Sequence, residues 1–326
     1  MNDLYPLKFQ PIIKEIIWGG EKLNTILNKK IGVLQEAAES WEISAIQDNI
    51  SVISNGFLKG NNLEELIGIY MGDLVGDKVY DNYGIEFPLL LKYIDAQDNL
   101  SIQVHPDNEL AKKRHNAYGK TEMWYVVQAD SNSSLISGFS SEVNKKTYLK
   151  HFNDKSLKDI LNTEPVKQGD VFFIPAGRIH AIGPGILLAE IQQSSDVTYR
   201  IYDWERKDKE GKGRELHTDL ALDAIDYKYY ESYKTPYEKR LNKTENLANC
   251  KYFTTNFIQF DKPLEKDYSA IDSFVIYMCV EGSFTLDYNF DNINIQKGET
   301  ILIPATLKEL KLLPDEISTL LEVYII

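Results

Sequence analysis

Short segments rich in branched and aromatic residues recur along most of the chain, and they constrain its fold more than any other feature. Each is bounded by glycine, proline, asparagine or aspartate, the pattern of a β-strand between turns. The first group comprises residues 87–94, 100–104, 123–127, 171–174, 186–191 and 197–202, and the second comprises 252–260, 273–280, 282–288, 293–295, 300–303 and 319–326. Short strands at this spacing predict a mainly β protein of the sandwich or barrel kind.

Helical patterns are fewer and shorter. Asn62 is placed to cap a helix over residues 62–70, where Glu64 and Glu65 in the first turn complement the helix dipole. Further helices are expected at residues 107–115 and 218–227, and residues 141–161 read as two short amphipathic helices that separate near Asn153. Because this last pair lies between strands, we interpret it as a helical insertion over the β core.

The length of 326 residues is enough for about two domains at roughly 150 residues each. A polar, tyrosine-rich stretch after Lys228 shows no sustained period and is the best linker candidate. We therefore expect one domain at residues 1–235, with its helical insertion at about 141–162, and a second at 246–326. The charged loop at 205–215 reads as a solvated surface loop.

The two predicted domains share a short internal repeat. The sequence GDVFFIPA at residues 169–176 resembles GETILIPA at 298–305, as if one turn-and-strand unit were used twice. The first copy continues to His180, whereas the second continues through Thr306 and Leu307 without a histidine. We therefore expect a metal site in the first domain and none of the same kind in the second.

Charge and cysteine content exclude several classes of protein. The chain has 36 Lys and Arg against 49 Asp and Glu, a formal net charge of −13, which disfavours general binding to nucleic acid or to anionic membranes. An anionic small substrate would need a local cluster of cations. Two cysteines are too few for a disulfide scaffold. The N-terminus does not resemble a secretory signal, and no apolar run approaches a membrane span, so we expect a cytoplasmic protein.

Three short stretches of the first domain carry residues suited to chemistry. They are SIQVHPD at residues 101–107, GKTEMWY at 119–125 and PAGRIH at 175–180. Strand alternation places Ser101, Gln103 and His105 on one face, where polar groups are costly to bury without partners. Two imidazoles, a carboxylate and an amide form a mixed nitrogen and oxygen set that suits Zn²⁺ or another borderline divalent ion. The other histidines are not accompanied by further candidate ligands, and we interpret them as surface residues: His115, His151 and His217.

With these stretches, the chain resembles class I mannose-6-phosphate isomerases of the short bacterial form, which belong to the cupin superfamily. The resemblance also includes Trp18-Gly19-Gly20, the stretch ESWEIS at residues 39–44, Lys92 and the stretch SDVTYR at 195–200. One departure is Ala38, where the family usually has glycine, and we expect only a small change in a loop. The resemblance implies two cupin-type jelly-roll barrels, the second of them degenerate.

The resemblance also implies residue roles. It places one Zn²⁺ per chain on Gln103, His105, Glu122 and His180. It makes Arg200 catalytic, places Lys92, Ser101 and Lys120 at the substrate pocket, and places Glu190 and Asp196 near it. The implied activity is interconversion of mannose 6-phosphate and fructose 6-phosphate through an enediol intermediate, with a small sugar phosphate as the only expected partner. The oligomeric state stays open.

The chemistry of these side chains is compatible with the implied roles but does not decide all of them. Arg200 offers a forked set of donors to a developing oxyanion or a phosphate, and Lys120 and Lys92 supply positive charge for the phosphate. The base that moves the carbon-bound proton could be Glu190, Asp196 or a water molecule held by the metal. Three other functions remain open: a metal-dependent cupin oxygenase, a sugar-binding or regulatory protein without turnover, and a different sugar-phosphate isomerase or epimerase.

Overall fold

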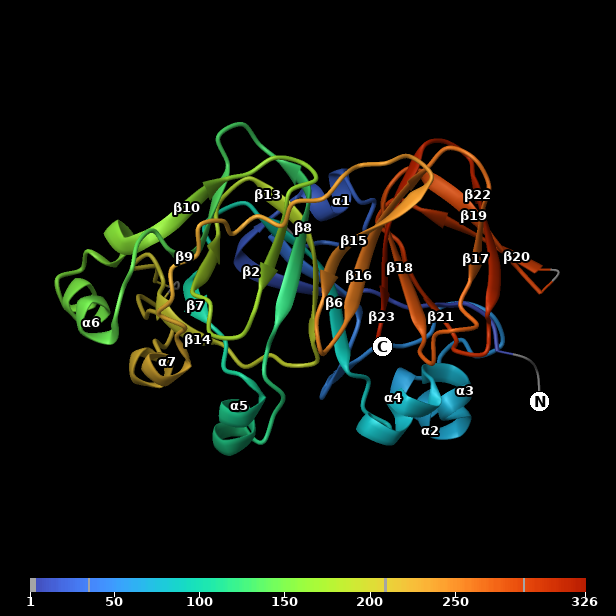
Figure 1. Ribbon diagram of the computed structural model, residues 1–326, viewed down its shortest axis with the longest axis horizontal. Helices are drawn as coiled ribbons and strands as arrows, with labels where there is room; N and C mark the ends of the chain where they lie inside the picture. The colour runs from blue at the N-terminus through green and yellow to red at the C-terminus, as the bar shows by residue number, and fades with distance from the viewer. Residues whose placement is uncertain (1–3, 35, 208–209, 290) are drawn as a thin grey trace.

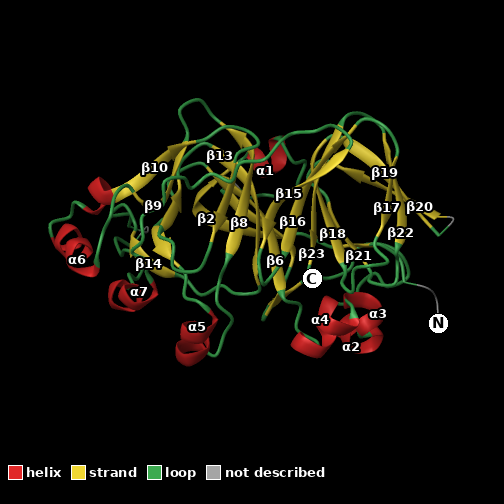
Figure 2. Ribbon diagram, in the orientation of Figure 1, coloured by secondary structure: helices red, strands yellow, loops and turns green. Residues whose placement is uncertain are grey.

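Antiparallel β-sheets stacked in four layers build the molecule (Figures 1 and 2). The structure, a computed structural model, describes residues 4–34, 36–207, 210–289 and 291–326. Two layers enclose what we call the first barrel and two enclose the second barrel. The predicted mainly β fold with two barrels is confirmed.

The first barrel consists of a five-stranded and a six-stranded sheet. In spatial order, the five-stranded sheet contains β10 (Leu161–Pro165), β9 (Ser134–Phe139), β12 (His180–Ile182), β7 (Ile102–Val104) and β14 (Tyr199–Tyr202). The six-stranded sheet contains β11 (Val171–Ile174), β8 (Glu122–Ala129), β13 (Ile186–Gln193), β6 (Leu89–Ala96), β3 (Ala37–Ile43) and β2 (Ile12–Gly20).

The second barrel consists of a six-stranded and a four-stranded sheet. The six-stranded sheet contains β1 (Leu7–Lys8), β21 (Thr300–Ile303), β18 (Val275–Glu281), β23 (Ser318–Tyr324), β16 (Thr254–Phe260) and β15 (Lys243–Asn249). The four-stranded sheet contains β17 (Leu264–Asp267), β22 (Glu309–Pro314), β19 (Ser283–Tyr288) and β20 (Asp291–Gln296). A separate small hairpin pairs β4 (Ala45–Ile46) with β5 (Asn49–Ile50).

Helices lie at the ends and around the outside of the two barrels (Figures 1 and 2). They are α1 (Lys22–Thr25), α2 (Leu63–Tyr70), α3 (Gly72–Val75), α4 (Asp77–Tyr83), α5 (Asn108–His115), α6 (Lys145–Asn153) with the 3₁₀ helix η1 (Leu157–Ile160), and α7 (Thr218–Ala224). Asn62 caps α2 as predicted, and its side chain and that of Glu65 form a reciprocal capping box. Within the described chain, no helix has the length and apolar character needed to cross a membrane.

The two six-stranded sheets pack face to face, and this contact joins the barrels. On β13, Leu187, Ala189 and Ile191 face the second barrel, and they belong to one hydrophobic cluster with Ile276 and Leu321. Every residue of β6 and β13 is buried. Sheets buried on both faces require nearly continuous apolar strands, which explains the runs in the sequence. The alternate residues of the same strands point into the first barrel.

The connection between the barrels differs from the prediction. Residues 228–242 do not form a free linker, because they contact both barrels: Lys234 forms a bridge with Phe172 of the first barrel, and Leu241 forms one with Gln259 of the second. Tyr233 is buried, and its hydroxyl accepts a hydrogen bond from the backbone N–H of Phe139 and donates one to its carbonyl. Lys234 Nζ lies 2.8 Å from a carboxylate oxygen of Asp170. The contacts of this stretch come from individual tyrosine rings and hydroxyls, which follow no regular spacing. The sequence therefore contains no periodic pattern that would predict them.

The N-terminal segment contains structure that the sequence patterns did not predict. Strands β2 and β3 complete the six-stranded sheet of the first barrel, but β1 pairs with β21 of the second barrel. Helix α3 lies against the second barrel as well, because the Val75 carbonyl accepts a hydrogen bond from the N–H of Phe274. Such long-range pairing leaves no local pattern that would reveal it.

Phe257 provides a test of the contact between the barrels. It is 1% exposed and packs against Tyr237 and Tyr125, with ring centroids 5.2 and 6.1 Å apart. Replacement Phe257→Ala should lower the free energy of unfolding by about 3–5 kcal/mol, because it opens a cavity between the sheets. Chemical denaturation measures this loss. Phe57, which is 50% exposed, is the matched control, and Phe57→Ala should cost about 1 kcal/mol or less. Equal losses in the two variants would contradict the predicted role of this contact.

Candidate metal centre and active site

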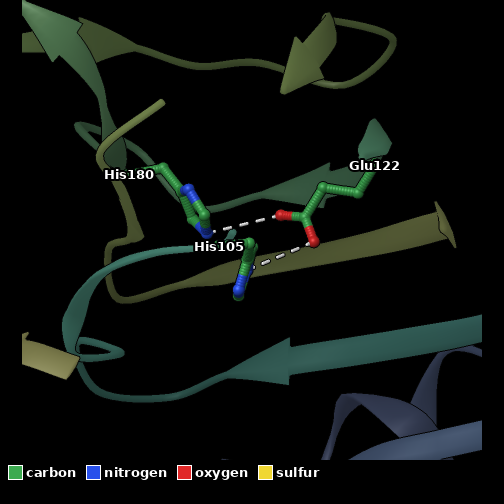
Figure 3. Close-up of side chains that lie close together, drawn as sticks. All are labelled: His105, Glu122 and His180. Atoms are coloured by element: carbon green, nitrogen blue, oxygen red, sulfur yellow. Dashed lines mark ion pairs between the residues drawn. The ribbon is translucent and has the colours of Figure 1, made fainter. Parts of the chain in front are cut away.

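Three side chains from separate parts of the chain converge between the two sheets of the first barrel (Figure 3). His105 directly follows β7, Glu122 is the first residue of β8, and His180 is the first residue of β12. One ligand atom from each lies within 4.8 Å of the others, and all three residues are buried. We call this group the His–Glu–His cluster.

Backbone hydrogen bonds orient both imidazoles toward the carboxylate. Nδ1 of His105 lies 3.0 Å from the Val197 carbonyl oxygen, and Nδ1 of His180 lies 2.9 Å from that of Arg178. Because a carbonyl can only accept, each Nδ1 carries the proton and each Nε2 presents a lone pair. The Nε2 atoms of His105 and His180 lie 3.5 and 3.4 Å from the two oxygens of Glu122. This tautomer and this orientation are those of metal-binding histidines.

The electrostatics of the cluster also suit a cation. Burial lowers the pKa of His105 well below its usual value and lowers that of His180 to about 4, so both rings are neutral near pH 7. Burial, with a contribution from Glu190, raises the pKa of Glu122 to about 8. Within the described chain, Nε2 of His105 and Oε1 of Glu122 have no hydrogen-bond partner, and Oε2 of Glu122 is in ion-pair contact with the Lys120 ammonium. Buried polar atoms without partners are costly, and a divalent cation would satisfy all three.

Gln103 is the fourth residue predicted to hold the metal. It lies directly opposite His180 in the pairing of β12 with β7, and its Nε2 is 3.3 Å from Nε2 of His180. The two ends of a side-chain amide are assigned from hydrogen bonding, and a half-turn of this amide would present its oxygen instead. Two imidazole nitrogens, a carboxylate and an amide oxygen fit a borderline divalent ion such as Zn²⁺.

A network of lysines and glutamates adjoins the cluster. Lys120 Nζ lies 3.2 Å from an oxygen of Glu122 and 3.9 Å from one of Glu190, and Lys92 Nζ lies 3.2 Å from Glu190 and 3.5 Å from Glu39. Lys92, Lys120 and Glu190 are buried. We call Glu39, Lys92, Lys120 and Glu190 the lysine–glutamate network.

Strand register aligns part of this network in one row. Lys92 on β6 lies opposite Glu190 on β13, and Glu190 lies opposite Trp124 on β8. Directly opposed residues of antiparallel strands point to the same face, so this row faces the interior of the first barrel. The Trp124 indole N–H donates a 2.8 Å hydrogen bond to Glu190.

The network keeps Lys92 and Glu190 charged. Burial alone would lower the pKa of Lys92, but the carboxylates of Glu39 and Glu190 outweigh it and raise that pKa. Burial alone would raise the pKa of Glu190, but Lys92 and Lys120 outweigh it and lower that pKa. The interior of the first barrel therefore holds fixed charges beside the His–Glu–His cluster.

The structure places the remaining predicted residues in three different settings. Arg200 on β14 lies opposite Gln103 on β7, is half-buried, and donates a 2.9 Å hydrogen bond to the Glu215 carbonyl. Its Nε is buried without a partner in the described chain. Ser101 is buried immediately before β7. Asp196 is exposed, and its carboxylate contacts no described member of the cluster or the network.

Sequence reasoning missed two participants. Glu39 accepts a 2.6 Å hydrogen bond from the Trp41 indole N–H and also pairs with Lys92. Trp124 orients Glu190 through its indole. A signal for Trp124 was available, because it lies two residues after Glu122 on one strand and so shares its face. Glu39 reaches the site only through the pairing of β3 with β6, which the sequence does not reveal.

Known proteins with the same organisation identify the family. A family profile described as "Phosphomannose isomerase type I, catalytic domain" matches residues 6–133, and one described as "Mannose-6-phosphate isomerase, cupin domain" matches residues 242–314. The chain is 34% identical to mannose-6-phosphate isomerase ManA of Bacillus subtilis, covering 94% of this chain and 95% of the relative. It is 36% identical to mannose-6-phosphate isomerase of Streptococcus mutans, covering 93% of each. The crystal structure of mannose 6-phosphate isomerase from Bacillus subtilis superimposes with a TM-score of 0.88 at 30% identity, covering 99% of this chain and 100% of that one. This chain therefore belongs to the type I mannose-6-phosphate isomerase family, with a cupin domain at its C-terminal end.

Proposed function

We propose that this protein is a zinc-dependent aldose–ketose isomerase that interconverts mannose 6-phosphate and fructose 6-phosphate through an enediol intermediate. The proposal rests on one observation above all: a buried His–Glu–His cluster directly adjoins a buried lysine–glutamate network, in a chain of this family. The first group suits a divalent cation, and the second brings positive charge into a barrel interior of an otherwise acidic protein.

Four residues would hold the metal. His105, Glu122 and His180 supply the three convergent ligand atoms, and Gln103 would add its amide oxygen. The mixed nitrogen and oxygen set favours Zn²⁺, at one ion per chain. When bound, a divalent cation acts as a Lewis acid that stabilises negative charge on the sugar oxygens as the enediol forms.

Cationic side chains of the chain itself would bind and orient the substrate. The ammonium groups of Lys92 and Lys120 lie beside Glu190, so their charge is held in place before the substrate arrives. We assign phosphate binding and oxyanion stabilisation to these lysines and to Arg200, whose half-buried guanidinium has a free Nε. Ser101, buried beside β7, would contact the sugar.

Glu190 is the better of the two candidate carboxylates for moving the carbon-bound proton. Its Oε2 is held by the Trp124 indole, and its buried Oε1 lies 3.2 and 3.9 Å from the ammonium groups of Lys92 and Lys120. The carboxylate is therefore oriented and ionised, and Oε1 is the atom that would accept the proton. Asp196, the other candidate, is exposed, and no group among the described residues bonds to its carboxylate.

The same observations disfavour the alternatives. A cupin oxygenase has no general need of buried lysines beside its metal. A binding protein without turnover would be favoured if Lys120 pointed away from the metal ligands, but its Nζ lies 3.2 Å from an oxygen of Glu122. A different sugar-phosphate isomerase would use the same groups, and the substrate assay below distinguishes it.

We also propose a division of roles along the chain. Residues 1–235 would form the catalytic domain, with the helical insertion at about 141–162, and residues 246–326 a second domain without a metal site. Strand register supports the second part. Counting from Gly169 and Gly298 in the internal repeat, Ile174 corresponds to Ile303. Glu122 lies opposite Ile174, whereas Val275 lies opposite Ile303, so an apolar residue replaces the carboxylate.

Removal of the metal tests the proposed reaction directly. Protein dialysed against a chelator should lose conversion of mannose 6-phosphate to fructose 6-phosphate in a coupled assay, and added Zn²⁺ should restore it, because the enediol charge needs the cation. Circular dichroism before and after dialysis controls for unfolding. Full activity in the metal-free protein would refute the metal role, and turnover of other sugar phosphates alone would refute the substrate.

His180→Ala tests the ligand set independently of activity. Loss of one of three convergent ligands should leave well below one metal ion per chain, measured by elemental analysis after gel filtration. His151→Ala is the matched control, because His151 lies on α6 and its ring bonds to Ser156. A full complement of metal in His180→Ala would remove this residue from the site.

The two carboxylates are compared by matched amide substitutions. Glu190→Gln keeps the shape of the side chain but removes the proton acceptor, so kcat should fall by roughly 10²–10⁴-fold while metal content is unchanged. Asp196→Asn should leave kcat within about twofold, since an exposed carboxylate without an orienting partner contributes little. If Asp196→Asn instead lowered kcat strongly and Glu190→Gln did not, the role of the base would belong to Asp196.

A further inference from the structure

The second barrel retains a buried glutamate at the position of Glu190. In the internal repeat, Phe172 corresponds to Ile301, since each lies three residues after the repeat's glycine. Trp124 lies opposite both Phe172 and Glu190. By the same register, Tyr277 lies opposite both Ile301 and Glu322.

The neighbours of this glutamate follow the same correspondence. Lys92 lies opposite Glu190, and Asn256 lies opposite Glu322. The second barrel has therefore lost the carboxylate at the position of the proposed metal ligand but kept a polar row across its inner face. That row reads Tyr277, Glu322, Asn256.

Glu322 is embedded in a complete set of partners. It is 2% exposed, and its Oε1 accepts a 2.5 Å hydrogen bond from Tyr268 and lies 2.7 Å from Nζ of Lys266. Its Oε2 accepts a 2.8 Å hydrogen bond from the amide of Asn256. The Tyr268 hydroxyl also bonds to that of Tyr277. Buried ion pairs of this kind contribute little net stability compared with apolar packing.

This network forms the floor of a cavity of about 460 Å³ in the second barrel. The walls combine apolar side chains, Leu264 and Ile271, with the hydroxyls of Thr244 and Tyr324. Lys266 lines the cavity with a side chain that is 14% exposed, and two of its three N–H donors are directed to Glu322 and Thr244. A concave site with apolar walls and a few fixed polar groups is the usual form of a small-molecule site.

We propose that this cavity is a second ligand site, which binds a neutral polyhydroxylated molecule of the size of a hexose or hexitol. Hydroxyl groups both donate and accept, which matches a floor of carboxylate, amide, ammonium and phenol groups. Apolar walls match the C–H faces of such a molecule. The proposal rests on the second barrel alone and is independent of the reaction assigned to the first.

Charge distinguishes this ligand from a sugar phosphate. Glu322 and Lys266 neutralise each other at the floor, so the cavity has no buried excess of positive charge. Lys243, Glu265 and Asp267 also line the cavity and together carry one net negative charge. A net negative lining disfavours a phosphate group, whereas an uncharged polyol is unaffected.

Saturation-transfer NMR with D-mannitol tests the site, because mannitol has no carbonyl group to isomerise and no phosphate. We expect a saturable signal with half-saturation below about 20 mM. The signal should persist in His180→Ala and weaken at least about fivefold in Lys266→Met, which removes the buried cation. Lys297→Met is the matched control, since Lys297 pairs with Glu281 elsewhere in the second barrel, and it should bind mannitol like the parent.

Asn256→Leu provides a second variant that keeps Lys266, and it should weaken mannitol binding as well. Thermal unfolding of each variant identifies any that fails to fold. Absence of a saturable mannitol signal, loss of the signal in His180→Ala, or unchanged affinity in both cavity variants would each overturn the proposal. Inorganic phosphate that binds in a manner sensitive to Lys266→Met would overturn the choice of a neutral ligand.

Discussion

The buried carboxylate of Glu122 lies between two neutral imidazoles, and the chemistry proposed for the first barrel depends on this contact. Glu122 has no hydrogen-bond partner in the described chain, and the nearest compensating charge is the ammonium of Lys120. Burial raises the pKa of Glu122 to about 8, so the two lysines balance Glu39 and Glu190 until Glu122 ionises to hold a cation. A divalent cation held by ionised Glu122 would leave this interior with one net positive charge. The interior would then attract an anionic substrate, although the chain as a whole carries −13.

The packing of the two six-stranded sheets stabilises the strands that carry this charged interior. On β13, the residues that alternate with Glu190 are apolar and lie in the cluster shared by both barrels. The strand is thus fixed from behind by hydrophobic burial while its other face carries charge. Lys92 and Glu190 face each other across neighbouring strands of this buried sheet, so their separation is set by backbone register and not by flexible loops. Rigid support of this kind is what electrostatic preorganisation requires.

Local sequence patterns predicted the strands and the chemistry better than the connections. Strands 171–174 and 300–303 have the predicted bounds, because a glycine turn precedes each and a proline follows it. The convergence of His105, Glu122 and His180 was expected from the family resemblance, because the residue types alone indicate only a set suited to a divalent ion. The pairing of Leu7 with Leu302 was not, because it depends on contacts almost the whole chain apart. The same reason hid Glu39, whose role depends on register between strands.

Comparison of the two barrels separates what the fold supplies from what residues supply. In both barrels a buried glutamate lies on the strand next to one that carries an inward-facing aromatic residue. Glu190 lies opposite Trp124, and Glu322 lies opposite Tyr277. On the strand that itself carries Trp124 or Tyr277, Glu122 in the first barrel faces histidines, whereas Val275 in the second lies in the hydrophobic core. Because one substitution removes a metal ligand without altering the strands, the architecture alone predicts no activity. The chemistry of each barrel follows from the few inward-facing side chains that differ between them.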